Sequence, residues 1–283
     1  MGKIIIASDS SSDLSPELIK RYDVKIMPYT VIMGEESYKD GIDVTPDDLL
    51  SFVAKTGKLP KTAAVNTAEA EDFINSIRSD PDDAIIFFTL SSKMSGTYQY
   101  ATLAAQNLGN VYTVDSQNLS TGVGHLVVKA AEMRDNGSSV EEILDVMNRM
   151  VPKVRASFIL DDLEHMCKGG RCSAVAAFGA NLLKIKPMIA VRDGEMGVAK
   201  KYRGQLCEVL KQYTLDLLEN KDNIILDRCF VTHTKMDPEW VGAIVELVKE
   251  TLPFKEVIET TAGATISVHA GPNCLGVLFV EKY

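Results

Sequence analysis

The chain has 283 residues, of which 46% are hydrophobic and 24% charged, and it carries a formal net charge of −9. These proportions are those of an ordinary globular protein and argue against a disordered, collagen-like or coiled-coil chain. The length predicts two domains or one large α/β domain. An acidic chain repels phosphate backbones and anionic lipid surfaces, so we expect no nucleic-acid partner.

The cysteines and the apolar runs bear on compartment and cofactors. The chain has five cysteines and no C-x-x-C pair, which predicts reduced thiols rather than a disulfide scaffold. No pair of histidines has metal-ligand spacing, so we expect neither a metal nor another cofactor. The first apolar run, Ile4–Ile6, ends at Ser8-Asp9, and no stretch approaches the roughly 18 apolar residues of a membrane span. We therefore expect a cytoplasmic protein without stable membrane insertion.

The first half of the chain alternates short apolar runs with helical patterns. Ser139 with Glu142, and Asn66 with Glu69, have the spacing of capping boxes. Alternation of strands and helices predicts a three-layer α/β/α domain with a parallel sheet. Strands are expected at Lys3–Ala7, Ala84–Leu90 and Val111–Val114, and helices after Ser15-Pro16 and Thr45-Pro46, at 66–77, and near 95–108, 121–134 and 139–151.

Hydroxyl-rich loops follow three of these strands, at Ser8–Asp13, Ser91–Ser95 and Asp115–Ser120. In a doubly wound fold such loops gather at the carboxyl ends of the strands, where ligands bind. The sequence therefore predicts a ligand site at this edge of the sheet.

The second half has a different pattern, with a hairpin signal at Asp193-Gly194. Hairpins joined to helices predict a two-layer α/β domain with a mixed sheet. A boundary near Pro152 gives domains at 1–152 and 153–283. Strands are expected at Ala156–Leu160, Pro187–Arg192, Met196–Tyr202, Cys229–Thr234, Glu256–Val268 and Leu275–Lys282, and helices at Asp161–Cys167, 203–220 and 238–251.

The segment Ser91–Tyr98 joins an apolar strand to a helix. Its Ser95 and Gly96 stand at a helix N-terminus, where free amides form a small oxyanion site, although a plain N-cap explains them equally well. The glycines of a nucleophile elbow are absent around Ser95, and so is a phosphate-binding G-x-x-x-x-G-K loop. Thr62 in Pro60-Lys61-Thr62 is either a ligand-facing loop hydroxyl or a solvated threonine.

Three further motifs have both structural and functional interpretations. Lys168-Gly169-Gly170-Arg171 is typical of a helix C-cap, with an arginine that can pair with nearby acids. His269-Ala270-Gly271-Pro272, placed between two expected strands, is a tight turn or a site of backbone approach to a ligand. The basic cluster Lys200–Arg203 is a solvated helix start or a docking point for an acidic or phosphate-bearing partner.

Taken together, the chain resembles the DegV family of bacterial proteins, and the resemblance runs along nearly its whole length. The order and spacing of the segments make it specific. The segments are Ser8–Leu14, Tyr38–Asp43, Pro60-Lys61-Thr62, Ser91–Tyr98, Val114-Asp115-Ser116, Asp161–Glu164 with Lys168–Arg171, Ile185-Lys186-Pro187 and His269–Pro272.

The resemblance implies two α/β domains with a long-chain fatty acid, such as palmitate, buried between them. It implies a non-catalytic, lipid-binding role in lipid transport or fatty acid metabolism. For some members it further implies service as the fatty-acid-binding subunit of a fatty acid kinase, whose separate ATP-binding subunit phosphorylates the carboxylate. Carried over by position, Thr62 and Ser95 bind the carboxylate, Gly96, Arg171 and His269 lie near the head group, and Arg203 faces the kinase partner.

One departure from the family pattern follows Thr62. The family usually continues Ser-Gln-Pro-Ser, whereas this chain has Ala63-Ala64-Val65-Asn66. The loop loses polar groups and a proline, which predicts an altered head-group geometry. Two alternatives stay open: a Ser/His acyl hydrolase with Ser95 as nucleophile and His269 as base, and a regulatory module that docks a partner through Lys200–Arg203.

Overall fold

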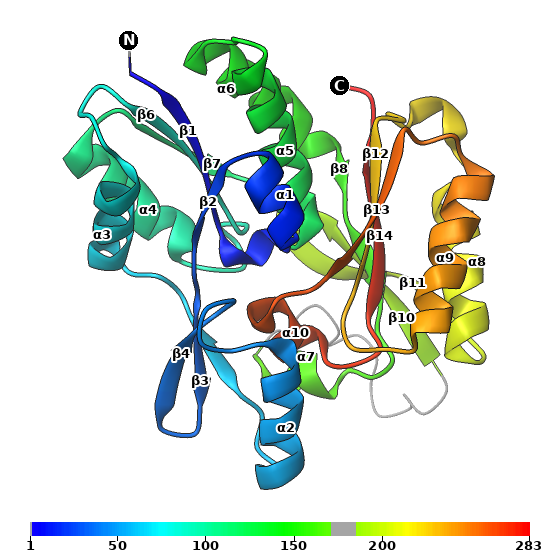
Figure 1. The fold of residues 1–283 in the computed structure, drawn as a ribbon. Coiled ribbons are helices and arrows are strands. Elements are labelled where there is room, and N and C mark those ends of the chain that lie inside the picture. Colours follow the sequence, from blue (N-terminus) through cyan, green and yellow to red (C-terminus); the bar gives the residue numbers. More distant parts are fainter. Residues whose placement is uncertain (1, 171–184) are drawn as a thin grey trace.

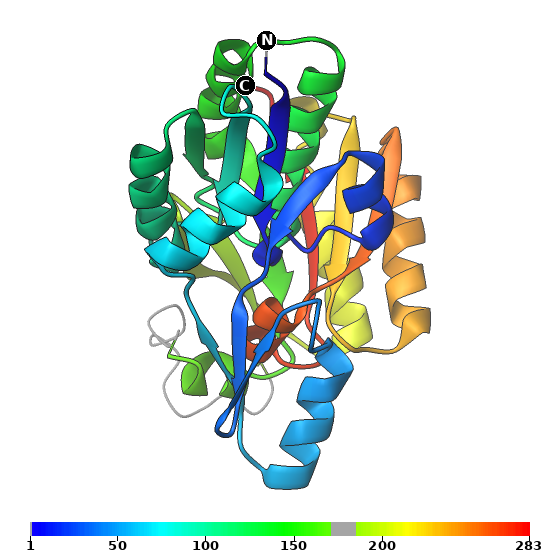
Figure 2. The same cartoon turned by 60° about the vertical axis from the view of Figure 1, so that its left-hand side comes forward.

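The computed structural model describes residues 2–170 and 185–283 (Figures 1 and 2). Up to residue 150 the elements are β1 Ile4–Asp9, α1 Pro16–Arg21, β2 Val24–Met27, β3 Thr30–Met33, β4 Glu36–Lys39, α2 Pro46–Thr56, β5 Lys61–Ala63, α3 Thr67–Ile77, β6 Ala84–Thr89, α4 Thr97–Leu108, β7 Val111–Asp115, α5 Thr121–Asp135 and α6 Val140–Met150. Beyond it they are β8 Val154–Arg155, β9 Ser157–Ile159, α7 Glu164–Lys168, β10 Ile185–Arg192, β11 Glu195–Arg203, α8 Leu206–Leu217, β12 Arg228–His233, α9 Pro238–Thr251, β13 Glu256–Thr261, α10 Ala264–Ala270 and β14 Leu275–Val280.

A parallel sheet in the order β2-β1-β6-β7 forms the centre of the first half. Every residue of β6 is buried, as its continuous apolar run predicts. Because side chains alternate along a strand, Ile85 and Phe87 pack with α3 and α4, while Ile86 and Phe88 pack in the cluster that contains α5. The predicted three-layer arrangement is confirmed (Figure 1).

The second half is built on a mixed sheet in the order β11-β10-β9-β14-β12-β13. Only β12 and β13 run parallel along this path, and β10 and β11 form the predicted hairpin around Asp193-Gly194. Helices α8 and α9 cover one face (Figure 1). The predicted mixed sheet is confirmed, while the domain boundary at residue 152 stays a prediction.

Helix α5 packs against both sheets. Its apolar side chains share one core cluster with Phe88 of the parallel sheet and with Phe230 and Leu278 of the mixed sheet. On the same helix, His125 Nε2 lies 3.0 Å from the Leu278 carbonyl oxygen, and burial lowers the His125 pKa to about 4. This histidine is therefore a neutral core residue that donates to β14.

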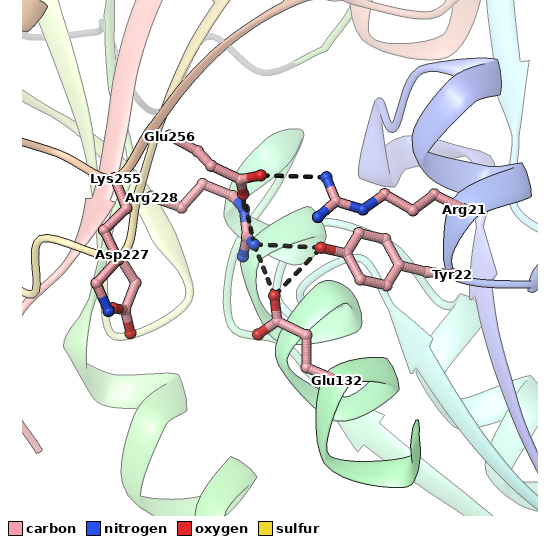
Figure 3. A network of polar contacts seen from close by, with 7 residues as sticks. All are labelled: Arg21, Tyr22, Glu132, Asp227, Arg228, Lys255 and Glu256. Carbon is pink, nitrogen blue, oxygen red and sulfur yellow. Dashed lines mark hydrogen bonds and ion pairs between the residues drawn. The ribbon is translucent and has the colours of Figure 1, made fainter. Parts of the chain in front are cut away.

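A buried arginine adds a polar connection between the same two parts (Figure 3). The Arg228 guanidinium, at the start of β12, donates to Glu132 of α5 at 2.7 Å and to Glu256 of β13 at 2.8 Å. It also lies 3.3 Å from the Tyr22 hydroxyl, and Arg21 donates to Glu256 at 3.1 Å. The network joins α1 and α5 to the edge of the mixed sheet.

A small antiparallel sheet, β4-β3-β5, was not predicted from the sequence. Thr62 lies in β5, opposite Val31 of β3, so its predicted place in a loop was wrong. The strands are only three or four residues long, and β4 is polar, so they lack an apolar pattern. Their core consists of Val31, Val44, Leu49, Ala264 and Val268, which draws α2 and α10 onto this sheet.

The predicted strand Glu256–Val268 was wrong in its second half, because β13 ends at Thr261 and α10 follows. Its β-branched residues favour a strand locally. The helix begins instead because two distant carboxylates accept its first amides: Asp13 accepts from Gly263 N–H at 2.8 Å, and Asp40 from Ala264 N–H at 2.9 Å. Consequently His269 lies in the last turn of a helix and not in a turn between strands.

Candidate ligand cavity

A cavity of about 270 Å³ lies where the carboxyl edge of the parallel sheet meets α10 and the mixed sheet. It exceeds the roughly 150 Å³ of an engineered apolar cavity that holds benzene. Most of its surface is apolar, contributed by Leu90, Met94, Leu119, Phe158, Met166, Met196, Ile266, Ala270, Cys274 and Leu278. The volume and lining suit an apolar ligand larger than a single ring.

Of the three loops that the sequence placed at the carboxyl edge of the sheet, Ser91–Ser95 and Asp115–Ser120 contribute residues to the cavity lining, and Ser8–Asp13 does not. The three loops are joined by hydrogen bonds: Asp9 Oδ2 accepts from Leu90 N–H at 2.8 Å, and Asp13 Oδ2 accepts from the Ser120 hydroxyl at 2.5 Å. Ser92 N–H donates to Asp115 Oδ1 at 3.0 Å. The predicted gathering of these loops is confirmed.

Thr62 and His269 form one polar pair on the cavity wall. Thr62 Oγ1 lies 2.8 Å from His269 Nε2, joining β5 to α10. The end of α7 approaches the same imidazole, since a Cβ placed on Gly169 would lie 2.5 Å from His269 Nδ1. The glycine predicted as a helix C-cap therefore also makes room for this histidine.

Ser95 and Gly96 reach the same cavity from the turn before α4. Ser95 Oγ lies 3.0 Å from Thr97 Oγ1 and accepts from Thr97 N–H at 3.3 Å. The Tyr29 hydroxyl lies 3.3 Å from the same oxygen. Ser95 is thus held in place from within the protein while it remains on the cavity wall.

Behind Ser95, Tyr29 connects the cavity to a buried carboxyl. The Tyr29 hydroxyl lies 3.3 Å from Asp9 Oδ2, and both residues are buried. Burial raises the pKa of Asp9 to about 6 despite hydrogen bonds from Ser11 and Leu90 that lower it. Burial, reinforced by the Asp9 charge, also raises the pKa of Tyr29 well above its ordinary value, so the phenol keeps its proton.

Two acids from the motifs quoted above hold α10 and do not line the cavity. Asp40 accepts from Ala264 N–H and Thr265 N–H, and Asp13 accepts from Gly263 N–H. Burial raises the pKa of Asp13 to about 8, and the nearby Asp40 charge adds to the shift. Since α10 carries His269, these acids fix one wall of the cavity.

The described side chains give the hydrolase hypothesis no support. Ser95 Oγ bonds to Tyr29 and Thr97, and within the described residues no hydrogen bond joins it to His269, which pairs with Thr62. A nucleophilic serine needs a base within hydrogen-bond reach. Burial raises the pKa of the cavity's Cys274 to about 12, so its thiol is protonated and unreactive.

Between residues 2 and 170 and from 185 onward, no three His, Cys, Asp or Glu side chains are grouped so that they could hold a metal ion. Over the same ranges, none of the helices has the length and apolar character that crossing a bilayer requires.

Four of the predicted site residues, Thr62, Ser95, Gly96 and His269, line the same cavity. Arg171 lies outside the described residues. Arg203 is exposed at the end of β11 opposite to the cavity-lining Met196.

Lys200, in the same basic cluster as Arg203, pairs with Asp216 at 2.6 Å.

Sequence reasoning missed Tyr29 as a lining residue, and no local motif marks it. Asp9 could have been found from the sequence, because it belongs to the Ser8–Asp13 loop that was predicted to lie at the ligand-binding edge of the sheet.

These features define an α/β protein with a largely apolar cavity and several fixed polar groups on its wall. The model of the DegV family, described as an uncharacterised protein family, matches residues 3–282. A DegV domain-containing protein of Caldanaerobacter subterraneus is 33% identical over the full length of both chains. The chain therefore belongs to the DegV family.

Solved structures of similar proteins cover nearly the whole chain. A DegV family protein from Thermus thermophilus, whose structure is described as fatty acid binding, has a TM-score of 0.89 at 27% identity, covering 99% of this chain and 100% of the other. DegV of Bacillus subtilis, a fatty acid binding protein, has 0.86 at 29%, covering both chains completely. A stearic acid-binding protein from Eubacterium ventriosum has 0.84 at 28%, covering 100% of this chain and 99% of the other.

Proposed function

We propose that this protein binds a long-chain fatty acid in the cavity, with Thr62 and Ser95 holding the carboxylate. One observation carries the proposal: two hydroxyls and an imidazole from three separate segments, Thr62, Ser95 and His269, line a largely apolar cavity. An ionised carboxylate in apolar surroundings needs hydrogen-bond donors, and these side chains supply them. The fatty acids bound by the Thermus, Bacillus and Eubacterium relatives support the same ligand class.

The energetics assign different tasks to the tail and the head group. Burying a methylene contributes roughly 0.8 kcal/mol, so a 16-carbon tail supplies on the order of 10 kcal/mol before ordering costs. A hydrogen bond to a charged group contributes about 1.5–3 kcal/mol. The tail therefore determines most of the affinity, and the hydroxyls determine depth and orientation. Because the net charge of −9 repels an anion, local donors must hold the carboxylate.

The wider role follows from the same proposal. The protein is a non-catalytic carrier in the cytoplasm, acting in lipid transport or fatty acid metabolism, with the ligand between the domains 1–152 and 153–283. It presents the carboxylate to an ATP-dependent fatty acid kinase, with the exposed Arg203 facing that partner. The family resemblance and the basic cluster at Lys200–Arg203 support the kinase role.

The test is a titration of delipidated protein with palmitate and with methyl palmitate, which keeps the tail and removes the charge. We expect both to bind, with the ester weaker by at least tenfold because it loses charge-assisted hydrogen bonds. Equal affinities for palmitate and methyl palmitate would contradict the assignment of the carboxylate site. If neither of them binds, the proposed function is contradicted.

A further inference from the structure

Asp9, Tyr29 and Ser95 form a continuous chain of polar contacts that leads from the buried end of β1 to the cavity. The Tyr29 hydroxyl lies 3.3 Å from Asp9 Oδ2 on one side and 3.3 Å from Ser95 Oγ on the other. Asp9 is fully buried and Tyr29 is 2% exposed, so water does not compete for the contact between them. Ser95 stands at the cavity end of this chain.

The direction of the hydrogen bonds along this chain depends on the charge of Asp9. Tyr29 has one hydroxyl proton, and a carboxylate accepts a stronger hydrogen bond than a neutral hydroxyl does. When Asp9 is ionised, Tyr29 donates to it and presents an oxygen acceptor to Ser95. When Asp9 is protonated, Tyr29 is released to donate to Ser95 Oγ, which turns the serine proton toward the cavity.

The groups around Asp9 determine how readily it takes up a proton. Asp9 Oδ1 accepts from Ser11 N–H at 3.1 Å and from the Ser11 hydroxyl at 2.5 Å, and Oδ2 accepts from Leu90 N–H at 2.8 Å. Asp13 adds a like charge on the same loop when it is ionised. No basic side chain among the described residues hydrogen-bonds to Asp9, and burial raises its pKa to about 6.

Other titratable groups line the cavity or bond to groups other than Asp9. His269 pairs with Thr62, and His233 lines the cavity from β12. Asp40 faces Ser10 and the amides of α10 rather than Asp9. An anionic ligand bound at Ser95 adds a second negative charge close to Tyr29 and Asp9, which favours the protonated form of Asp9.

From this geometry we propose that Asp9, acting through Tyr29 on Ser95, is a positioning residue that couples carboxylate binding to the uptake of a proton. The inference rests on the proposed fatty-acid function. The bound state holds more protons than the free state, so affinity rises as pH falls through the range in which Asp9 titrates. If each binding event takes up one full proton, the affinity for the fatty acid rises tenfold for each unit by which the pH falls, which is the largest pH dependence that this coupling allows.

The test is calorimetric titration of delipidated protein with palmitate at pH 6.5, in phosphate and in imidazole buffer. The two buffers differ in ionisation enthalpy, so the difference in binding heat reports the protons taken up. We expect uptake by the wild type and less than half of that uptake by Asp9→Asn and by Tyr29→Phe. Tyr29→Phe serves as the second variant because the amide of Asp9→Asn would place an N–H donor against the Ser11 and Leu90 groups that donate to Asp9.

The control is Asp83→Asn, a buried carboxyl just before β6 that accepts from Lys3 N–H at 2.8 Å and from Asp80 N–H at 3.1 Å and does not line the cavity. We expect it to keep the wild-type proton uptake, because Asp83 bonds to neither Tyr29 nor Ser95. Palmitate binding without proton uptake, or full uptake by Asp9→Asn and Tyr29→Phe, would overturn the coupling and leave the proposed function intact. A wild type that binds no palmitate would overturn both.

Discussion

Replacing Ser95 with alanine removes one hydroxyl from the cavity wall. Tyr29 keeps Asp9 as its acceptor, but the buried Thr97 N–H loses Ser95 Oγ, so the free energy of unfolding should fall by about 1–3 kcal/mol. The lost hydrogen bond to a carboxylate is worth about 1.5–3 kcal/mol, which corresponds to about a 10- to 150-fold weaker Kd for palmitate. The apolar lining is unchanged, so binding should weaken without being abolished.

The assay is displacement of a fluorescent fatty acid from delipidated protein, with chemical denaturation as the check on folding. Ser92→Ala is the matched control, because Ser92 lies in the same loop and donates to Asp115 at 2.5 Å, outside the cavity lining. We expect the control to stay within about twofold of the wild-type Kd, a free-energy difference of about 0.4 kcal/mol. A Ser95→Ala protein with wild-type affinity, or an equal loss in both variants, would refute the assignment of Ser95 to the carboxylate.

Three further variants test other parts of the structure. Thr62→Val keeps the side-chain shape and removes the hydroxyl, so the palmitate Kd should rise about tenfold or more in the same displacement assay, and an unchanged Kd would exclude this contact. Arg228→Met leaves Glu132 without its cationic partner and Glu256 with Arg21 alone, and denaturation should show a loss of about 2–3 kcal/mol with little change in Kd; undiminished stability would show that the network is dispensable. For Asp13, whose folded-state pKa is raised from 3.8 to about 8, the stability contribution is present below pH 4 and lost as pH rises toward 8. Compared with Asp13→Asn, the wild type should therefore lose roughly 3–5 kcal/mol of unfolding free energy over that range, and parallel pH profiles would contradict this.

Sequence patterns within single segments correctly predicted the strands and helices that form from such patterns. The continuous apolar run of β6 predicted a central parallel strand, and the capping boxes at Asn66 and Ser139 predicted where α3 and α6 begin. The sheet β4-β3-β5 was not predicted because its strands are short and partly polar. Helix α10 was not predicted because Asp13 and Asp40, whose carboxylates accept its first amides, are more than 200 residues away in sequence.

In the candidate site, too, residues in local motifs were predicted and contacts between distant segments were not. Ser95 was predicted because it stands in a recognisable strand-to-helix turn, and the resemblance supplied Thr62 and His269. The contact between those two residues depends on β5 and α10 meeting across 207 positions of sequence, which no local pattern encodes. Tyr29 was missed for the same reason, since its partners Asp9 and Ser95 come from other elements.

The most direct test of the account is native mass spectrometry of the purified protein, followed by extraction and identification of whatever it carries. The account predicts one long-chain fatty acid per protein, retained through the apolar lining and depleted in the Ser95→Ala variant. A protein that carries no acyl chain and gains no mass when incubated with palmitate would contradict the central claim that this cavity is a fatty-acid site.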